Sequence, residues 1–126
     1  MLLWHTHPRP YTGFHERVES IYRRLVPDWE PPASPGMTEE GIDRVRSELE
    51  RGRGPFGPVV RRSFDWSRVY SRADYVRLLS TYSDHLLMPD ALRRELFADV
   101  GALADREFGG AIERPYRTEL LVAAKR

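Results

Sequence analysis

The fold of this chain is decided by the stretch Phe64-Asp65-Trp66-Ser67-Arg68-Val69-Tyr70, which leads into Tyr75-Val76-Arg77-Leu78-Leu79-Ser80-Thr81-Tyr82-Ser83. In the first stretch and the residues before it, apolar and polar side chains alternate, which predicts a strand. We expect Val60, Phe64 and Trp66 to share the inward face of that strand. The second stretch has helical spacing, so a strand should pass directly into a helix here.

Working outward from this stretch, apolar periodicity and turn residues predict three strands and four helices. Thr12, Thr38 and Ser71 are the expected N-caps of three of the helices. In chain order the expected elements are strand Met1–His7, helix Phe14–Val26, helix Thr38–Arg51, strand Pro58–Ser67, helix Ser71–Tyr82, helix Pro89–Glu107 and strand Ala111–Ala123.

Composition limits the classes of protein that this chain can belong to. Its 126 residues suit one domain, 1–126, and 20 Lys plus Arg against 19 Asp plus Glu leave a net charge of +1. A chain with so little net charge has no strong electrostatic attraction to nucleic acid or to an anionic membrane, so we expect neither as a partner. The chain has no cysteine, which excludes disulfides and thiolate chemistry. With no apolar run near the roughly 20 residues of a spanning helix, we expect a soluble cytoplasmic protein.

A third stretch follows, later in the chain, the two quoted first. It reads Gly109-Gly110-Ala111-Ile112-Glu113-Arg114-Pro115-Tyr116-Arg117-Thr118-Glu119-Leu120-Leu121-Val122-Ala123-Ala124, and the three stretches occur in a recognisable order. That order resembles the last third of a class I S-adenosylmethionine-dependent methyltransferase of the small-molecule type. Such enzymes have a seven-stranded sheet of order 3-2-1-4-5-7-6 with the last strand antiparallel. By motif, Leu2–His7 resembles the fifth strand, Val59–Trp66 the sixth and Ala111–Ala123 the seventh.

The resemblance implies an α/β fold, a truncated Rossmann-like half with a three-stranded mixed sheet and about four helices. It implies that the helix at Ser71–Tyr82 closes over the methyl acceptor. The family's cofactor contacts belong to its first two strands, which have no counterpart in these residues, so we expect no bound S-adenosylmethionine unless a partner chain supplies that half. The string Gly52-Arg53-Gly54-Pro55-Phe56-Gly57 matches the glycine pattern of a nucleotide-binding loop, but such a loop follows a strand and precedes a helix. Here a helix is expected before the string and a strand after it, so we expect no cofactor to bind there.

His5 and His7 are the candidate catalytic residues. They are two positions apart on a predicted strand, so both side chains lie on one face. A metal pair would need a third ligand, and no spacing points to one, so we expect no metal site. Ligands of open α/β sheets bind beyond the carboxyl ends of the strands. A histidine there can act as a general base, because its ordinary pKa lies near neutrality. Capping of the strand end is the alternative role.

Trp4 and Tyr82 are the candidate substrate-binding residues. Trp4 lies on the same predicted strand as the two histidines, and Tyr82 ends its helix, where its hydroxyl could turn into a cleft. Aromatic side chains at such spacings also fill cores, and we expect core positions for Trp66 and Tyr75.

The opening strand is expected to lack a neighbour on one side. The fourth strand of the full family would flank it, and without that strand Leu2–Trp4 expose backbone groups and an apolar face. Two copies could pair edge to edge as a homodimer. A separate methyltransferase-half chain could supply the neighbour instead, or the chain could be a fragment arising from a misplaced start codon.

Three functions are consistent with these features. The first is a truncated methyltransferase-like protein without methyl transfer of its own, acting as a small-molecule-binding or accessory protein. The second is a subunit or fragment of an active S-adenosylmethionine-dependent methyltransferase. The third is a repurposed cleft that catalyses a cyclase- or isomerase-type reaction in small-molecule biosynthesis, with His5 or His7 as the base. Positioning two substrates together is the main requirement of methyl transfer, which favours the first function.

Overall fold

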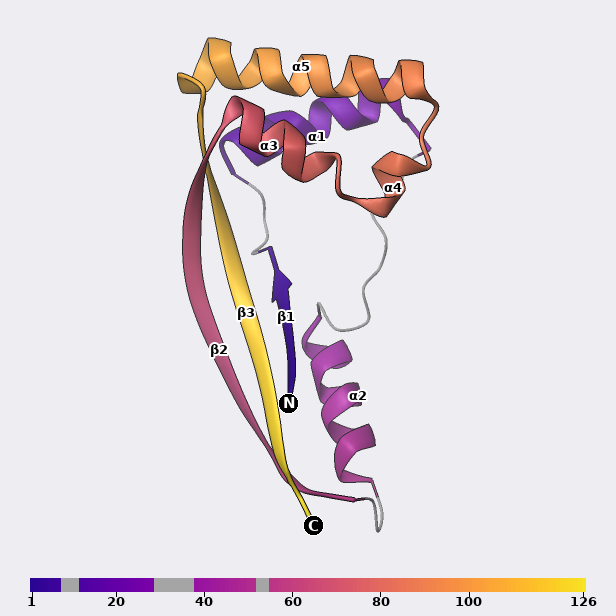
Figure 1. Cartoon of the computed structure of the whole chain (residues 1–126), viewed down its shortest axis with the longest axis vertical. Helices are drawn as coiled ribbons and strands as arrows, with labels where there is room; N and C mark the ends of the chain where they lie inside the picture. The colour runs from indigo at the N-terminus through magenta and orange to yellow at the C-terminus, as the bar shows by residue number, and fades with distance from the viewer. Residues whose placement is uncertain (8–11, 29–37, 52–54) are drawn as a thin grey trace. The chain divides into compact units, whose positions relative to one another are not determined.

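The computed structural model of the chain describes residues 1–7, 12–28, 38–51 and 55–126 (Figure 1). Residues 52–54 of the glycine-containing string lie outside the described residues. The described elements are β1 (Leu2–Thr6), α1 (Phe14–Leu25), α2 (Glu39–Glu50), β2 (Phe56–Ser71), α3 (Arg72–Leu79), α4 (Ser83–Leu86), α5 (Asp90–Phe108) and β3 (Ala111–Lys125).

The described part of the chain is an α/β protein with one three-stranded sheet of order β1-β3-β2. β3 pairs antiparallel with β1, and Trp4 lies opposite Glu119. On the other side of β3, Arg61 contacts Glu119 while Trp66 contacts Tyr116, so the numbering of β2 rises as that of β3 falls. The sheet is therefore antiparallel throughout.

The expectation of a mixed sheet is wrong, and the strand order gives the reason. Because β3 lies between the other two strands, each hydrogen-bonded pair includes β3, and β3 runs opposite to both neighbours. A mixed sheet would need two parallel strands side by side. The described residues also contain five helices rather than about four, since the short α4 follows α3.

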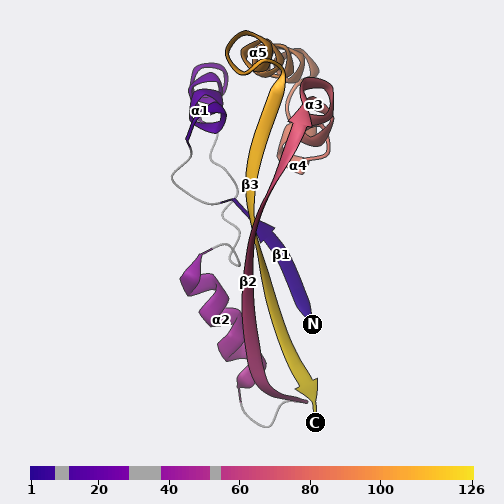
Figure 2. The ribbon, with the colours of Figure 1, turned by 90° about the vertical axis from the view of Figure 1, so that its left-hand side faces the viewer.

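The chain divides into two compact units, and both long strands contribute to each of them. The first unit contains β1, α2 and the larger parts of β2 and β3. In Figure 2, α2 runs beside this part of β2 and β3. α2 begins after Thr38, whose side chain accepts a hydrogen bond from the Gly41 amide. Its inner face packs Ile42 against Val59 and Leu121 of the sheet.

The opposite face of the sheet in this unit is apolar and exposed. Val60, Phe64 and Trp66 share a face by alternation, and they are 57%, 49% and 41% exposed. The expectation that these three residues point into the core is therefore wrong. Alternation shows which side chains share a face, but whether another layer covers that face depends on the rest of the fold.

The second unit contains α1, α3, α4 and α5 with the adjoining ends of β2 and β3. α5 packs against both α1 and α3, and Leu96 and Val100 of α5 are fully buried. Phe14 of α1 packs edge-on against Tyr75 of α3, which confirms Tyr75 as a core residue. Gly109 ends α5 with a φ of 62°, a left-handed conformation that glycine adopts without strain.

Candidate functional site

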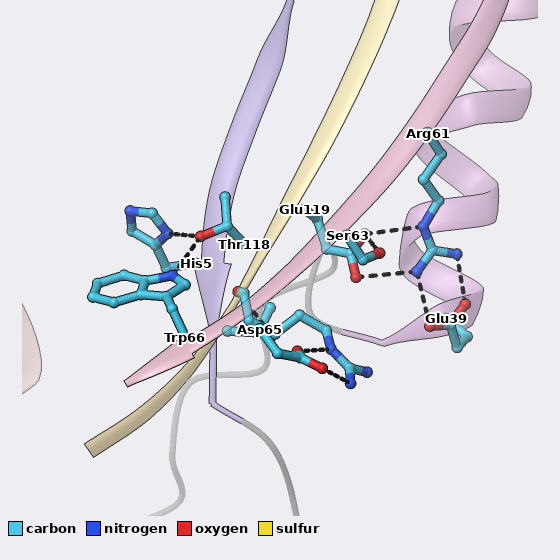
Figure 3. Close-up of polar contacts among 10 residues, drawn as sticks. His5, Glu39, Arg61, Ser63, Asp65, Trp66, Thr118 and Glu119 are labelled. Carbon is cyan, nitrogen blue, oxygen red and sulfur yellow. Dashed lines mark hydrogen bonds and ion pairs between the residues drawn. The ribbon is translucent and has the colours of Figure 1, made fainter. Parts of the chain in front are cut away.

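His5 of β1 and His7, one residue beyond its end, both lie beside the Tyr116 ring on one face of the first unit, as their spacing predicts. His5 lies opposite Thr118 in the sheet. The Nδ1 atom of His5 is 2.8 Å from Thr118 Oγ1, and the indole Nε1 of Trp66 donates to the same oxygen at 2.8 Å (Figure 3). Since a hydroxyl has two lone pairs and one hydrogen, it can serve both partners in either tautomer of His5. His5 is exposed, and its Nε2 is the nitrogen not used in this bond.

Aromatic rings surround these polar contacts. The Trp66 and Tyr116 rings stack with centroids 4.4 Å apart and an angle of 12° between planes. His5 meets Trp66 edge-on at 5.7 Å, and His7 lies 5.0 Å from Tyr116. We call His5, His7, Trp66, Tyr116 and Thr118 the histidine–tryptophan patch. Chemically, this patch offers exposed rings for stacking and an imidazole nitrogen for proton transfer.

Trp4 lies on the opposite face of β1. It pairs with Glu119 rather than with Thr118, and it packs against the core cluster of Ile42, Val59 and Leu121. The structure therefore does not bring Trp4 together with His5 and His7. Adjacent residues of a strand point to opposite faces, so a strand position alone already predicts this separation.

A charge network lies on the α2 side of the same sheet. Glu119 is 1% exposed and accepts hydrogen bonds from Arg61 and Ser63, and Arg61 also binds Glu39 of α2 (Figure 3). These hydrogen bonds, above all that from Arg61, hold the pKa of Glu119 below its ordinary value. The pKa of Arg61 is raised, first by Glu39 and then by Glu119. The network ties α2 to the sheet, and its paired carboxylates are poorly suited to accept a proton.

The second unit contains a hydrogen-bonded chain that the sequence did not reveal. Oδ1 of Asp84 accepts from the His85 amide at 2.9 Å and from His85 Nδ1 at 2.8 Å. The carboxylate can only accept, so it selects the imidazole tautomer protonated at Nδ1. Nε2 of that tautomer accepts the hydroxyl hydrogen of Tyr22. His85 is 2% exposed, and burial is the main cause that raises the pKa of Tyr22.

Tyr82 lies beside this chain, within the second unit. Its ring is 5.6 Å from that of His85, and the guanidinium carbon of Arg114 lies 5.7 Å from the Tyr82 and Tyr75 ring centroids. Burial raises the pKa of Tyr82, and the charge of Arg114 opposes that rise. Burial and the same charge lower the pKa of His15. The half-buried Tyr82 therefore contributes to an aromatic cluster around the buried guanidinium of Arg114.

Sequence signals for these missed residues were weak. Glu119 follows Glu113, Arg114 and Arg117 in the same strand, so one more charge there gave no sign that this carboxylate is buried. Asp84 and His85 follow Tyr82 closely, but Tyr22 is 63 positions away from His85. A partner that distant can be found only from the fold.

The described residues contain no group of three or more His, Cys, Asp and Glu side chains that could hold a metal ion. Within the same residues, no helix combines the length and apolar character needed to cross a bilayer.

Comparisons with known proteins do not place the chain in a family. No family model matches it, and neither a curated protein nor a solved structure matches it significantly.

Proposed function

We propose that this segment is the acceptor-side part of a class I methyltransferase-like sheet and acts as a small-molecule-binding or accessory protein. In this proposal the 126 residues alone transfer no methyl group. The observation that carries the proposal is the position of β3 between β1 and β2, antiparallel to both.

The strand order supports the proposal because it is not the simplest order available. Strands that follow one another in sequence are usually neighbours, and a plain meander would put β2 in the middle. The last strand lies in the middle instead. The resemblance assigns the strands to positions five, six and seven of an order that ends 5-7-6, which is the order β1-β3-β2.

The contacts of His5 and His7 support a ligand-binding role for this sheet. His5 lies one residue before the carboxyl end of β1 and His7 one residue beyond it, where the ligands of open α/β sheets bind. Thr118 holds His5 through Nδ1, which leaves Nε2 for a ligand or for a proton in a general-base role. Tyr82 is the proposed ligand contact in the second unit.

Methyl transfer depends on holding two substrates in reactive geometry. The proposed contacts serve only the acceptor, so the segment should bind S-adenosylmethionine weakly or not at all. Calorimetric titration of the folded chain with S-adenosylmethionine tests this, with His5→Ala as a variant. We expect no saturable heat up to millimolar cofactor for either protein. Micromolar binding by the wild-type chain would overturn the proposal.

A second candidate, a subunit of an active methyltransferase, is favoured by the position of β1 at the edge of the sheet. An edge strand can pair with a strand from another chain. This candidate predicts that cofactor affinity appears only in a complex. Coexpression with the products of adjacent genes, followed by purification and the same titration, distinguishes the two functions.

A further inference from the structure

The uncovered face of the sheet in the first unit forms one apolar surface. β1 places Leu3 opposite Leu120 and His5 opposite Thr118, so these residues share a face. Trp66 donates to Thr118, which puts Trp66, Phe64 and Val60 on that face by alternation. Val122 joins them from β3. We call Leu3, Val60, Phe64, Trp66 and Val122 the apolar sheet face.

These five side chains are more exposed than their chemistry favours. Their exposed fractions run from 41% for Trp66 and Val122 to 57% for Val60, with 49% for Phe64 and 53% for Leu3. α2, the one helix described in this unit, packs on the opposite face through Ile42. The face presents apolar surface on the order of 500 Å², which reaches the upper range of the largest patch on a typical monomer.

We propose that the apolar sheet face is the contact surface of a homodimer, formed with the same face of a second copy. This inference does not depend on the proposed function, and it differs from edge-to-edge pairing through β1. A stable dimer needs about 800 Å² from each partner, of which about 65% is apolar in homodimers. An apolar area on the order of 500 Å² is close to that apolar share, so polar residues around it would supply the remainder.

The shape of the face also suits a second copy. Two sheet faces pack at about 10 Å separation with side chains interdigitated, which aromatic and branched side chains on three strands allow. Arg62 is the charged residue between Val60 and Phe64 on this face. A two-fold axis near Phe64 would place each Arg62 away from the centre of the interface, by about 7 Å at roughly 3.3 Å per residue. Its long side chain lets the guanidinium extend from there into the solvent at the edge of the interface.

Sedimentation equilibrium at 10–200 μM tests the proposal. The wild-type chain should show twice its 14.7 kDa mass. Phe64→Arg should weaken self-association by at least 100-fold and give a monomer. Val60→Glu is a second variant at a more exposed position, in case Phe64→Arg fails to fold. The matched control is Val69→Arg, because Val69 also lies on β2, is 65% exposed and belongs to the second unit. The control should stay dimeric.

Circular dichroism and thermal unfolding establish that each variant is folded. A wild-type monomer at 200 μM would overturn the proposal. So would a folded Phe64→Arg or Val60→Glu variant that stays dimeric, because edge pairing through β1 does not involve β2, on the far side of the sheet. Loss of the dimer in Val69→Arg would also contradict it. None of these outcomes depends on cofactor binding, so this test and the calorimetric one fail separately.

Discussion

Glu119 is a buried carboxylate on the central strand, and its hydrogen-bond donors come from β2. Arg61 binds both of its oxygens, at 3.0 and 3.1 Å, and Ser63 donates at 2.6 Å. A buried charge is tolerated when it is paired and hydrogen-bonded, and removing one partner is then costly. Glu119 is therefore the residue at which a single change tests how the sheet and α2 are held together.

Glu119→Gln should lower the free energy of unfolding by about 2 kcal/mol at pH 7, because Arg61 loses its buried counter-charge. Chemical denaturation followed by circular dichroism measures the change. Glu48→Gln is the matched control, since Glu48 is an exposed residue of α2, and it should shift stability by less than about 0.5 kcal/mol.

The same pair of proteins should differ in pH dependence. The pKa of Glu119 is lower in the folded than in the unfolded chain. Its contribution to stability is therefore complete above the unfolded value, near 4.3, and is lost as pH falls through the lower folded value. The difference between wild type and Glu119→Gln should shrink as the pH falls from 5 to 3. A difference that stays constant over this range would show that Arg61 does not stabilise the carboxylate.

At the residue scale, sequence reasoning succeeds where a local rule applies. The spacing of His5 and His7 correctly predicts a shared face, since strand geometry alone decides it. The same rule groups Val60, Phe64 and Trp66 correctly, but it cannot show whether a helix covers them. Glu119 and Tyr22 were missed because their partners are far away in the sequence.

At the scale of elements, α2 holds the first unit together and depends on a local cap. Thr38 accepts from the Gly41 amide at 3.0 Å. Thr38→Ala should lower the free energy of unfolding by about 1 kcal/mol, because an orphan amide at the helix start loses its acceptor. Thermal unfolding measures the loss. Ser47→Ala on the exposed face of α2 is the control and should be neutral or slightly stabilising. Equal melting temperatures for Thr38→Ala and wild type would contradict the capping role.

The helices and strands themselves were largely predictable. Ser71 caps α3 through the Asp74 amide as expected, and the bounds of α1 and α5 differ from expectation by about one residue. Thr12 is not a cap, because Gly13 occupies the N-cap position of α1. α4 was missed, since four residues carry too little periodicity. β2 extends beyond the expected strand at both ends, because pairing with β3 overrides weak local signals.

At the scale of the whole molecule, strand pairing was the hardest feature to predict. Periodicity gives the three strands but not their order, and the mixed sheet expected from the resemblance is not observed, since both hydrogen-bonded pairs include β3. The exposed apolar sheet face likewise follows only from the assembled sheet. Together, the strand order and this exposed face motivate both the proposed function and the proposed dimer.

Nuclear Overhauser effects across the sheet test the strand order most directly. In the isotopically labelled chain, backbone protons of the central strand around Glu119 should show cross-strand contacts with both neighbours, near Trp4 on β1 and near Ser63 on β2. No backbone contacts should link β1 with β2. Direct contacts between β1 and β2, or a strand β3 with contacts on one side only, would contradict the strand order β1-β3-β2.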